Sequence, residues 1–316
     1  MRRAFLLVVV ISSVFVSCTP ELDTSGTSCL GLESTAPGGF TTESYGEFRY
    51  YSPCFNPLDS NQFVYVRETT ASGVFELIKH TISANNDSIL TVCTNDIAPK
   101  WGKKGLILYG MGATVNMIDD ETGEITPAFP DTYIHTNPDW DAKGEKIISH
   151  YNNGGIEGTM ISDMDGIVLH TSTDMNYYNG GWYPNKDKIA FPYGSGDDYG
   201  LVWTDSTLSD TTHYHTIKLY SDLDLVSSIV WYKNQQDMLW VTDRTVNVTN
   251  INNGNTRRLL ENCEEAKYLV PSISGSGKQF LFQKEIKSKV SETELFVEDK
   301  IVLMNLDGSG ETDILF

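Results

Sequence analysis

A short pattern recurs six times along the chain and constrains its fold more than any other feature. Each copy has a large apolar anchor, a polar turn and then an apolar triplet, as in WYPNKDKIAF at residues 182–191. The anchors are Phe55, Trp101, Trp140, Trp182, Trp231 and Ile273, separated by 46, 39, 42, 49 and 42 residues. A nearly fixed period of this length indicates one supersecondary unit repeated along the chain.

Each copy has the composition of a four-stranded unit. Apolar triplets such as Ile189-Ala190-Phe191 are short β-runs, and turns rich in Gly, Asn and Asp separate the runs. One such sheet cannot bury both of its faces, so neighbouring units must stack around a common axis. Six units fill residues 46–316. The sequence therefore predicts a single all-β domain, a six-bladed β-propeller of four-stranded antiparallel blades.

The repeat also resembles a known one. The pattern Pro-x-Trp-x-Pro-Asx-x-x-x-Ile-Ala-Phe, best preserved around residues 182–191, is similar to the WD40-like repeat of TolB-type propellers. The same repeat occurs in the propeller domains of prolyl-oligopeptidase-like peptidases. This resemblance covers nearly all of residues 50–316 and implies a TolB-like fold. It implies no activity, because propellers are scaffolds for many unrelated sites.

The N-terminus has the features of a secretory signal. Arg2 and Arg3 precede an apolar run at residues 4–16 that is too short to span a bilayer, which predicts a signal peptide over residues 1–17. The following sequence FVSC resembles a bacterial lipobox, with Phe where Leu is usual, and makes Cys18 the predicted lipidation site. An ordinary secretory signal is the alternative.

The resemblance to bacterial lipoproteins implies a cellular location. Thr19 follows the cysteine, with no Asp to signal inner-membrane retention, so an outer-membrane lipoprotein facing the periplasm or the cell surface is expected. Residues 18–45 are rich in Thr, Ser, Gly and Glu, which predicts a flexible tether between the lipid and the propeller. Membrane contact is then expected through the lipid anchor alone.

Four further cysteines are present in a compartment that permits disulfides: Cys29, Cys54, Cys93 and Cys263. They allow three pairings, among which the sequence does not choose. Cys29 with Cys54 is the most local pairing and would join the N-terminal segment to the domain. Free buried thiols are the alternative.

The charge balance limits the choice of partners. The chain has 42 acidic and 23 basic residues and a formal charge of −19. Nucleic acid is excluded, because phosphate backbones are bound by Lys and Arg patches. The sequence thus favours a monomer without a cofactor that binds an envelope protein or a glycan through its loops. The alternative is a propeller enzyme of polysaccharide lyase or glycosidase type.

Residues that follow the second-strand triplets define a candidate site. They are expected in loops on one face of the disc, at the mouth of the central channel. This predicted channel-mouth set comprises Arg67, His150, Tyr151, Tyr193, Asp243 and Arg244. Catalysis would require these groups to converge in a pocket, and no Ser/His/Asp order in the sequence identifies a catalytic triad.

Other candidate residues each have a structural interpretation beside a functional one. His213 and His215 alternate in a strand, so both imidazoles would face one side and bind a divalent metal, as the His-x-His pair of oligogalacturonate lyase binds manganese; an exposed polar edge is the alternative. The four anchor tryptophans are expected in the core between blades rather than in a sugar-binding platform. The charged run at residues 284–300 predicts a solvated hairpin, with contact to a partner as the alternative.

Overall fold

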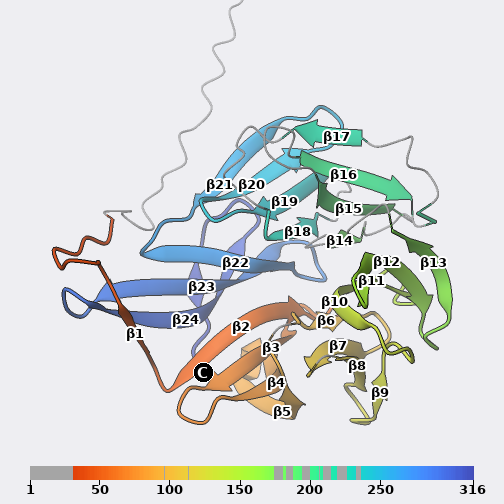
Figure 1. Cartoon of the computed structure of the whole chain (residues 1–316), viewed down its shortest axis with the longest axis horizontal. Coiled ribbons are helices and arrows are strands. Elements are labelled where there is room, and N and C mark those ends of the chain that lie inside the picture. The colour runs from red at the N-terminus through yellow and green to blue at the C-terminus, as the bar shows by residue number, and fades with distance from the viewer. Residues whose placement is uncertain are drawn as a thin grey trace, which may run out of the picture.

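The computed structural model describes residues 31–95, 97–112, 114–173, 181–182, 188–193, 200–205, 207–208, 215–218, 226–232 and 236–316. Their strands form six sheets around a common centre (Figure 1). No helix in this part of the chain is both long enough and apolar enough to cross a membrane. The prediction of an all-β propeller built from four-stranded antiparallel blades is confirmed.

The first three sheets are meanders in which each strand pairs with the next along the chain. Sheet 1 contains β2 (Phe48–Phe55), β3 (Gln62–Thr69), β4 (Val74–Thr81) and β5 (Asn86–Cys93), with the short 3-10 helix η1 (Ile82–Ala84) before β5. Sheet 2 contains β6 (Lys100–Trp101), β7 (Leu106–Met111), β8 (Thr114–Asp119) and β9 (Ile125–Pro127). Sheet 3 contains β10 (Ile134–Trp140), β11 (Lys146–Asn153), β12 (Ile156–Asp163) and β13 (Val168–Ser172).

The next two sheets repeat this order, and the last one departs from it. Sheet 4 contains β14 (Gly181–Trp182), β15 (Lys188–Tyr193), β16 (Gly200–Asp205) and β17 (His215–Lys218), and it is described only in separate stretches. Sheet 5 contains β18 (Ser228–Trp231), β19 (Asp237–Val241), β20 (Thr245–Asn250) and β21 (Thr256–Glu261). Sheet 6 contains β22 (Ala266–Ile273), β23 (Gln279–Lys289), β24 (Glu294–Asn305), β25 (Thr312–Asp313) and β1 (Thr42–Tyr45).

Every repeat anchor occupies the same place in its sheet. Phe55, Trp101, Trp140, Trp182, Trp231 and Ile273 are the last residues of β2, β6, β10, β14, β18 and β22, the first strands of the six sheets. The apolar triplets follow in the second strands, where both faces of the sheet are covered by neighbouring sheets. The sequence repeat therefore corresponds to the structural repeat.

Each anchor tryptophan packs on the preceding sheet. Trp101 clusters with Val64 and Leu77 of sheet 1, and Trp140 with Leu108 and Met117 of sheet 2. Trp182 packs in the same way on Ile148 and Ile161 of sheet 3, and Trp231 on Ala190 of sheet 4. All four side chains are buried. The prediction that they form core between blades is confirmed.

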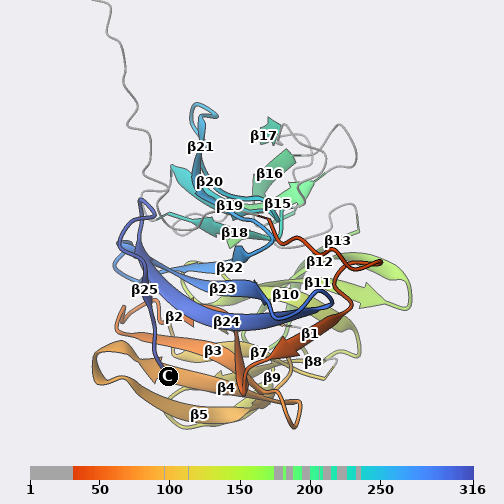
Figure 2. The same ribbon diagram turned by 90° about the vertical axis from the view of Figure 1, so that its left-hand side faces the viewer.

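Sheet 6 is completed by strands from both ends of the described chain. β1 pairs in parallel with Glu294–Val297 of β24, whereas β25 pairs antiparallel with Val302 and Leu303 farther along the same strand. Figure 2 shows β1 and β25 at opposite ends of β24. β1 thus covers the first part of the outer edge of β24.

The segment before β1 contacts the long β23–β24 hairpin, which contains most of the charged run 284–300. Thr35 donates its main-chain N–H to the Glu292 carboxylate (2.7 Å), and Lys287 forms an ion pair with Glu43 (2.8 Å). The hairpin thus holds residues that the sequence placed in a flexible tether. The ordered body extends at least from Thr35 onward.

The most local of the possible cysteine pairings is not formed. Neither Cys54 nor Cys93 forms a disulfide, so a Cys29–Cys54 disulfide is wrong. Cys263 is disulfide-bonded, and its partner lies outside the described residues. Cys93 is buried in the apolar cluster that also contains Trp101.

Candidate functional site

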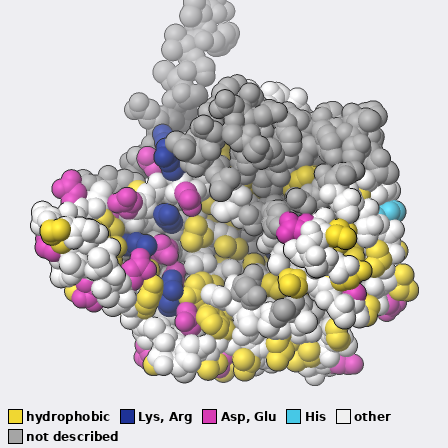
Figure 3. Space-filling view, in the orientation of Figure 1, with side chains coloured by type: hydrophobic (Ala, Val, Ile, Leu, Met, Phe, Trp, Pro, Cys, Tyr) yellow, Lys and Arg dark blue, Asp and Glu magenta, His cyan; other side chains and the backbone are white. Residues whose placement is uncertain are grey.

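A cavity of about 380 Å³ lies where the first strands of all six sheets converge. Its walls include all six anchors together with the residue just before each of them. Figure 3 shows hydrophobic side chains around the centre of one face, and charged side chains of both signs over β22, β23 and β24. A concave, largely apolar site with a few polar groups is the usual form of a ligand-binding pocket.

Three of the first strands contain the same backbone irregularity beside this cavity. Ser52, Asn137 and Val270 each lie three positions before an anchor and have φ of 50°, 50° and 44°. Each marks a register shift in the pairing with the second strand, and each precedes a proline that lines the cavity or adjoins its wall. A positive φ is unfavourable for a β-branched residue such as Val270. These bulges turn the ends of the strands toward the cavity.

Hydrogen bonds connect neighbouring first strands around the cavity. Where the residue before an anchor has a short polar side chain, that side chain accepts the main-chain N–H of the next anchor. Cys54 Sγ accepts from Trp101 (3.4 Å), and Asp139 Oδ2 accepts from Trp182 (3.1 Å). The contact between sheets 6 and 1, which closes the ring, has the same form: Ser272 Oγ accepts the main-chain N–H of Phe55 (2.9 Å).

At two other junctions the indole N–H is the donor in place of the main-chain N–H, and a main-chain carbonyl accepts. Trp140 Nε1 donates to the carbonyl of Lys100 (3.0 Å), and Trp231 Nε1 donates to the carbonyl of Gly181 (3.2 Å). Lys100 and Gly181 are again the residues immediately before an anchor. The wall of the cavity is therefore a chain of hydrogen bonds between sheets, which makes it rigid.

The acidic groups of the cavity wall are engaged in main-chain contacts. The Asp139 carboxylate accepts the N–H groups of both Trp140 (3.0 Å) and Trp182, and Asp141 accepts the N–H groups of Glu145 (2.6 Å) and Lys146 (3.1 Å). Burial raises the pKa of the Cys54 thiol, which favours the protonated form. Both carboxylates of this wall are therefore satisfied by main-chain donors.

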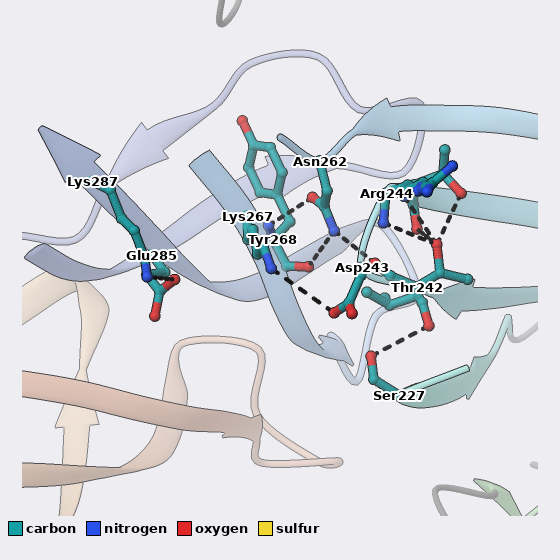
Figure 4. Close-up of polar contacts among 11 residues, drawn as sticks. Ser227, Thr242, Asp243, Arg244, Asn262, Lys267, Tyr268, Glu285 and Lys287 are labelled. Carbon is teal, nitrogen blue, oxygen red and sulfur yellow. Dashed lines mark hydrogen bonds and ion pairs between the residues drawn. The ribbon is translucent and has the colours of Figure 1, made fainter. Parts of the chain in front are cut away.

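None of the predicted channel-mouth residues whose side chains the structure describes lines the cavity. Arg67 lies in β3, where its guanidinium pairs with Glu76 (2.8 Å) and lies over the ring of Phe48. Asp243 is exposed and lies 4.0 Å from Lys267 (Figure 4). Arg244 belongs to the same turn, where its main-chain N–H donates to Thr242 Oγ1 (3.2 Å).

The remaining members of that set lie in second strands. His150 and Tyr151 are buried in β11, and burial lowers the pKa of the His150 imidazole. Tyr193 ends β15, and its side chain lies outside the described residues. His213 and the side chain of His215 are also outside them, so the metal site stays a prediction. In the part of the chain that is described, no three His, Cys, Asp or Glu side chains form a metal-binding group.

A hydrogen-bonded Ser, His and Asp arrangement does occur in sheet 3, which the sequence did not predict. His135 Nδ1 contacts Ser149 Oγ and its Nε2 contacts Asp131 Oδ1, both at 2.9 Å. Ser149 is fully buried, and the imidazole stacks on Phe129 with ring centroids 3.8 Å apart. A nucleophile must reach its substrate, so this arrangement is a buried structural network.

Comparison with known proteins defines the class by fold. No family model and no curated protein sequence matches this chain. A solved structure assigned as TolB from Agrobacterium tumefaciens has a TM-score of 0.58 and 11% identity, over 85% of this chain and 90% of the other. The chain is thus a TolB-like β-propeller in its fold.

Further solved structures show that this fold serves different activities. TolB from Acinetobacter baumannii matches with a TM-score of 0.51 and 17% identity, over 66% of this chain and 53% of the other. An oligogalacturonate lyase in complex with manganese matches with a TM-score of 0.53 and 11% identity, over 84% and 77%. Identities this low establish the fold alone.

Proposed function

We propose that this protein is a six-bladed, lipid-anchored propeller of the bacterial cell envelope that binds a protein or glycan partner without catalysis. The observation that carries this proposal is the cavity to which all six first strands contribute. Its acids are held by main-chain N–H groups, and its tryptophans offer broad apolar walls. Six sheets, with the last bonded to the first through Ser272 and Phe55, support the six-bladed ring.

The cellular location rests on the sequence and on one cysteine. The predicted signal peptide and Cys18 favour an outer-membrane lipoprotein that faces the periplasm or the cell surface. The disulfide at Cys263 fits such an oxidising compartment. Because neither Cys54 nor Cys93 forms a disulfide, acylation of Cys18 leaves Cys29 as the partner of Cys263.

Mass spectrometry of the non-reduced, membrane-extracted protein tests the location. We expect a diacylated or triacylated peptide that begins at Cys18 and a disulfide-linked peptide pair that contains Cys29 and Cys263. An unmodified Cys18, or a disulfide between Cys18 and Cys263, would remove the lipid anchor from the proposal.

Photo-cross-linking in cells tests the binding site. A benzophenone amino acid at Ala142, in the cavity wall, is expected to capture an envelope protein or glycan, and Ala98→Trp in the same chain should abolish that adduct by filling the cavity. The matched control places the same amino acid at the exposed Ile167. An adduct that survives Ala98→Trp, or turnover of an oligosaccharide by the purified protein, would contradict binding without catalysis at this cavity.

A further inference from the structure

A second candidate site lies at the closing junction, under the segment that contains and follows β25. Residues 312–316, called here the strap, run from sheet 6 onto sheet 1 (Figure 2). The first two residues of the strap pair with β24, and the N–H of Ile314 donates to the carbonyl of Ile301 (2.9 Å). Phe316 then lies against side chains of sheet 1. The strap is therefore a short added strand that carries one aromatic side chain across the junction.

The ring of Phe316 lies against three other rings, those of Tyr50, Tyr65 and His80, which are called here the aromatic cup. The Phe316 ring stacks on Tyr50 with centroids 4.5 Å apart, and its centroid lies 4.8 Å from that of Tyr65. It meets the imidazole of His80 edge to face, with centroids 5.4 Å apart. Tyr65 and His80 are buried, whereas Phe316 is 43% exposed. The cup thus already holds a ring delivered by an extended segment, which shows the kind of side chain that fits it.

The imidazole of the aromatic cup has an unsatisfied acceptor. His80 Nδ1 lies 2.8 Å from Asp87 Oδ1, and Tyr65 donates its hydroxyl to the other carboxylate oxygen of Asp87 (2.9 Å). Because a carboxylate only accepts, Nδ1 carries the proton, so Nε2 of the neutral imidazole is an acceptor. This Nε2 is buried and has no hydrogen-bond partner in the described part of the chain. Leaving a buried acceptor unsatisfied is unfavourable, so the phenyl ring of Phe316 is an incomplete match to the cup.

The other contacts of the strap are few and mostly exposed. Asp313, three positions before the aromatic residue, forms an ion pair with Lys300 (3.1 Å), and the two side chains are 39% and 30% exposed. Ion pairs at this exposure contribute little to stability. Leu315 is 73% exposed, and Ile314 is only partly buried. A segment held in this way is expected to open locally and to exchange with a competitor.

We propose that the aromatic cup and the adjoining edge of β24 form a docking site for an extended protein segment that displaces the strap and has a tyrosine three residues after an acidic residue. The segment adds to β24 at residues 301–303, as the strap does. Its acidic side chain pairs with Lys300, and its tyrosine enters the cup. With ring centroids 5.4 Å apart, a hydroxyl on the ring that replaces Phe316 can reach His80 Nε2 and donate to it. The proposal is independent of the central cavity and of the lipid anchor.

Fluorescence anisotropy with synthetic peptides tests the docking site. The probe is a labelled, amidated pentapeptide, Thr-Asp-Ile-Leu-Tyr, titrated with the purified full chain and with its Phe316→Ala variant, in which the strap no longer fills the cup. We expect saturable binding to both proteins, about tenfold weaker to the wild type because the strap competes. Replacing the peptide's tyrosine by alanine should weaken binding about tenfold, and replacing it by phenylalanine about threefold.

Three outcomes of these titrations contradict the proposal. No binding to either protein, or equal binding of the tyrosine and alanine peptides, would overturn the docking site. Binding to the Phe316→Ala chain alone would show that the strap is not displaced and would overturn exchange with a partner. A phenylalanine peptide that binds as tightly as the tyrosine peptide would overturn the hydrogen bond to His80.

The ion pair with Lys300 tests the register of the docked segment. Adding Lys300→Gln to the Phe316→Ala chain should weaken the tyrosine peptide about two- to fivefold relative to a peptide with Asn in place of Asp. The comparison between peptides is needed because any loosening of the strap affects both of them equally. The matched change Lys278→Gln, at an exposed turn of the same sheet, should leave the ratio unaltered. Equal responses of the Asp and Asn peptides to Lys300→Gln would overturn the assigned register.

Discussion

Five junctions join sheets that are adjacent in sequence, and a sixth closes the ring. Four of the five are sealed by an anchor tryptophan that packs on the preceding sheet, and at the fifth Ile273 packs against the apolar cluster of sheets 5 and 6. The closing junction between sheets 6 and 1 has Phe55 at the equivalent position, together with the buried contact of Asp299 with Arg49 and Gln283. β1 and the aromatic contact of Phe316 with Tyr50 add to this junction alone.

This difference follows from chain connectivity. An internal junction joins sheets that are adjacent in sequence, so burial of a large indole and one hydrogen bond at the anchor hold them. The closing junction joins residues about 250 positions apart, and the chain must find both the partner and the register. A buried ion pair with a second hydrogen bond to Gln283 is directional, which suits it to defining register. The structure therefore combines a rigid wall around the cavity with a more polar closure.

The largest expected effect comes from an internal junction. Trp140→Ala removes a buried indole and its hydrogen bond to the Lys100 carbonyl, and should lower the free energy of unfolding by about 3–5 kcal/mol. Urea denaturation measures this, with Val168→Ala on the exposed edge of sheet 3 as the control. A loss no larger than that of the control would show that the indoles do not hold the ring.

The closing junction should be less costly to perturb. Asp299→Asn keeps the shape of the side chain but leaves Arg49 without its counter-charge, for an expected loss of about 2–3 kcal/mol. A double-mutant cycle with Arg49→Met isolates the pair, and the two losses should be clearly non-additive. Additive losses would mean that the ion pair does not couple the two sheets.

The smallest effect is expected in β1 and depends on pH. The hydrogen bond from Lys287, followed by that from Tyr45, holds the pKa of Glu43 below its ordinary value of 4.5. The ionised form is therefore favoured by folding, and its contribution is present above about pH 4.5 and is lost as pH falls through the lowered pKa. Glu43→Gln should cost about 0.2–1 kcal/mol at neutral pH.

Denaturant unfolding of wild type and Glu43→Gln at pH 7 and at pH 3 checks this sign. The difference between the two proteins should shrink on acidification. A difference that is constant or that grows at low pH would contradict the ion pair between β1 and the hairpin.

The repeat predicted much of the fold because its anchors are set by packing that recurs in each sheet. The same six anchors also line the cavity, which the sequence analysis assigned only to the core. The Pro-x-anchor spacing was a usable signal, since Pro53, Pro138 and Pro271 each follow one of the bulged residues. The hydrogen bonds between neighbouring first strands could not be predicted from the sequence, because they depend on the positions of individual atoms.

The described members of the predicted channel-mouth set do not line this cavity, for a geometric reason. First and second strands are antiparallel, so the residues that end a second strand, such as Arg244 after β19, lie toward the opposite face from the anchors that end the first strands. The pairing of β1 with β24 could not be predicted from the sequence either, because the partner strand begins at Glu294, far along the chain. Nothing in a four-residue strand specifies such a partner.

Hydrogen exchange measured by mass spectrometry tests the contrast between the two kinds of junction most directly. Amides of β7 and β11, on either side of the Trp140 junction, are expected to exchange only through global unfolding. Amides of β1 and of the outer edge of β24 should exchange through a smaller, local opening with a distinctly lower free energy. Equal protection of the two regions, or stronger protection at the closing junction, would contradict a ring with a rigid cavity wall and a separate, weaker closure.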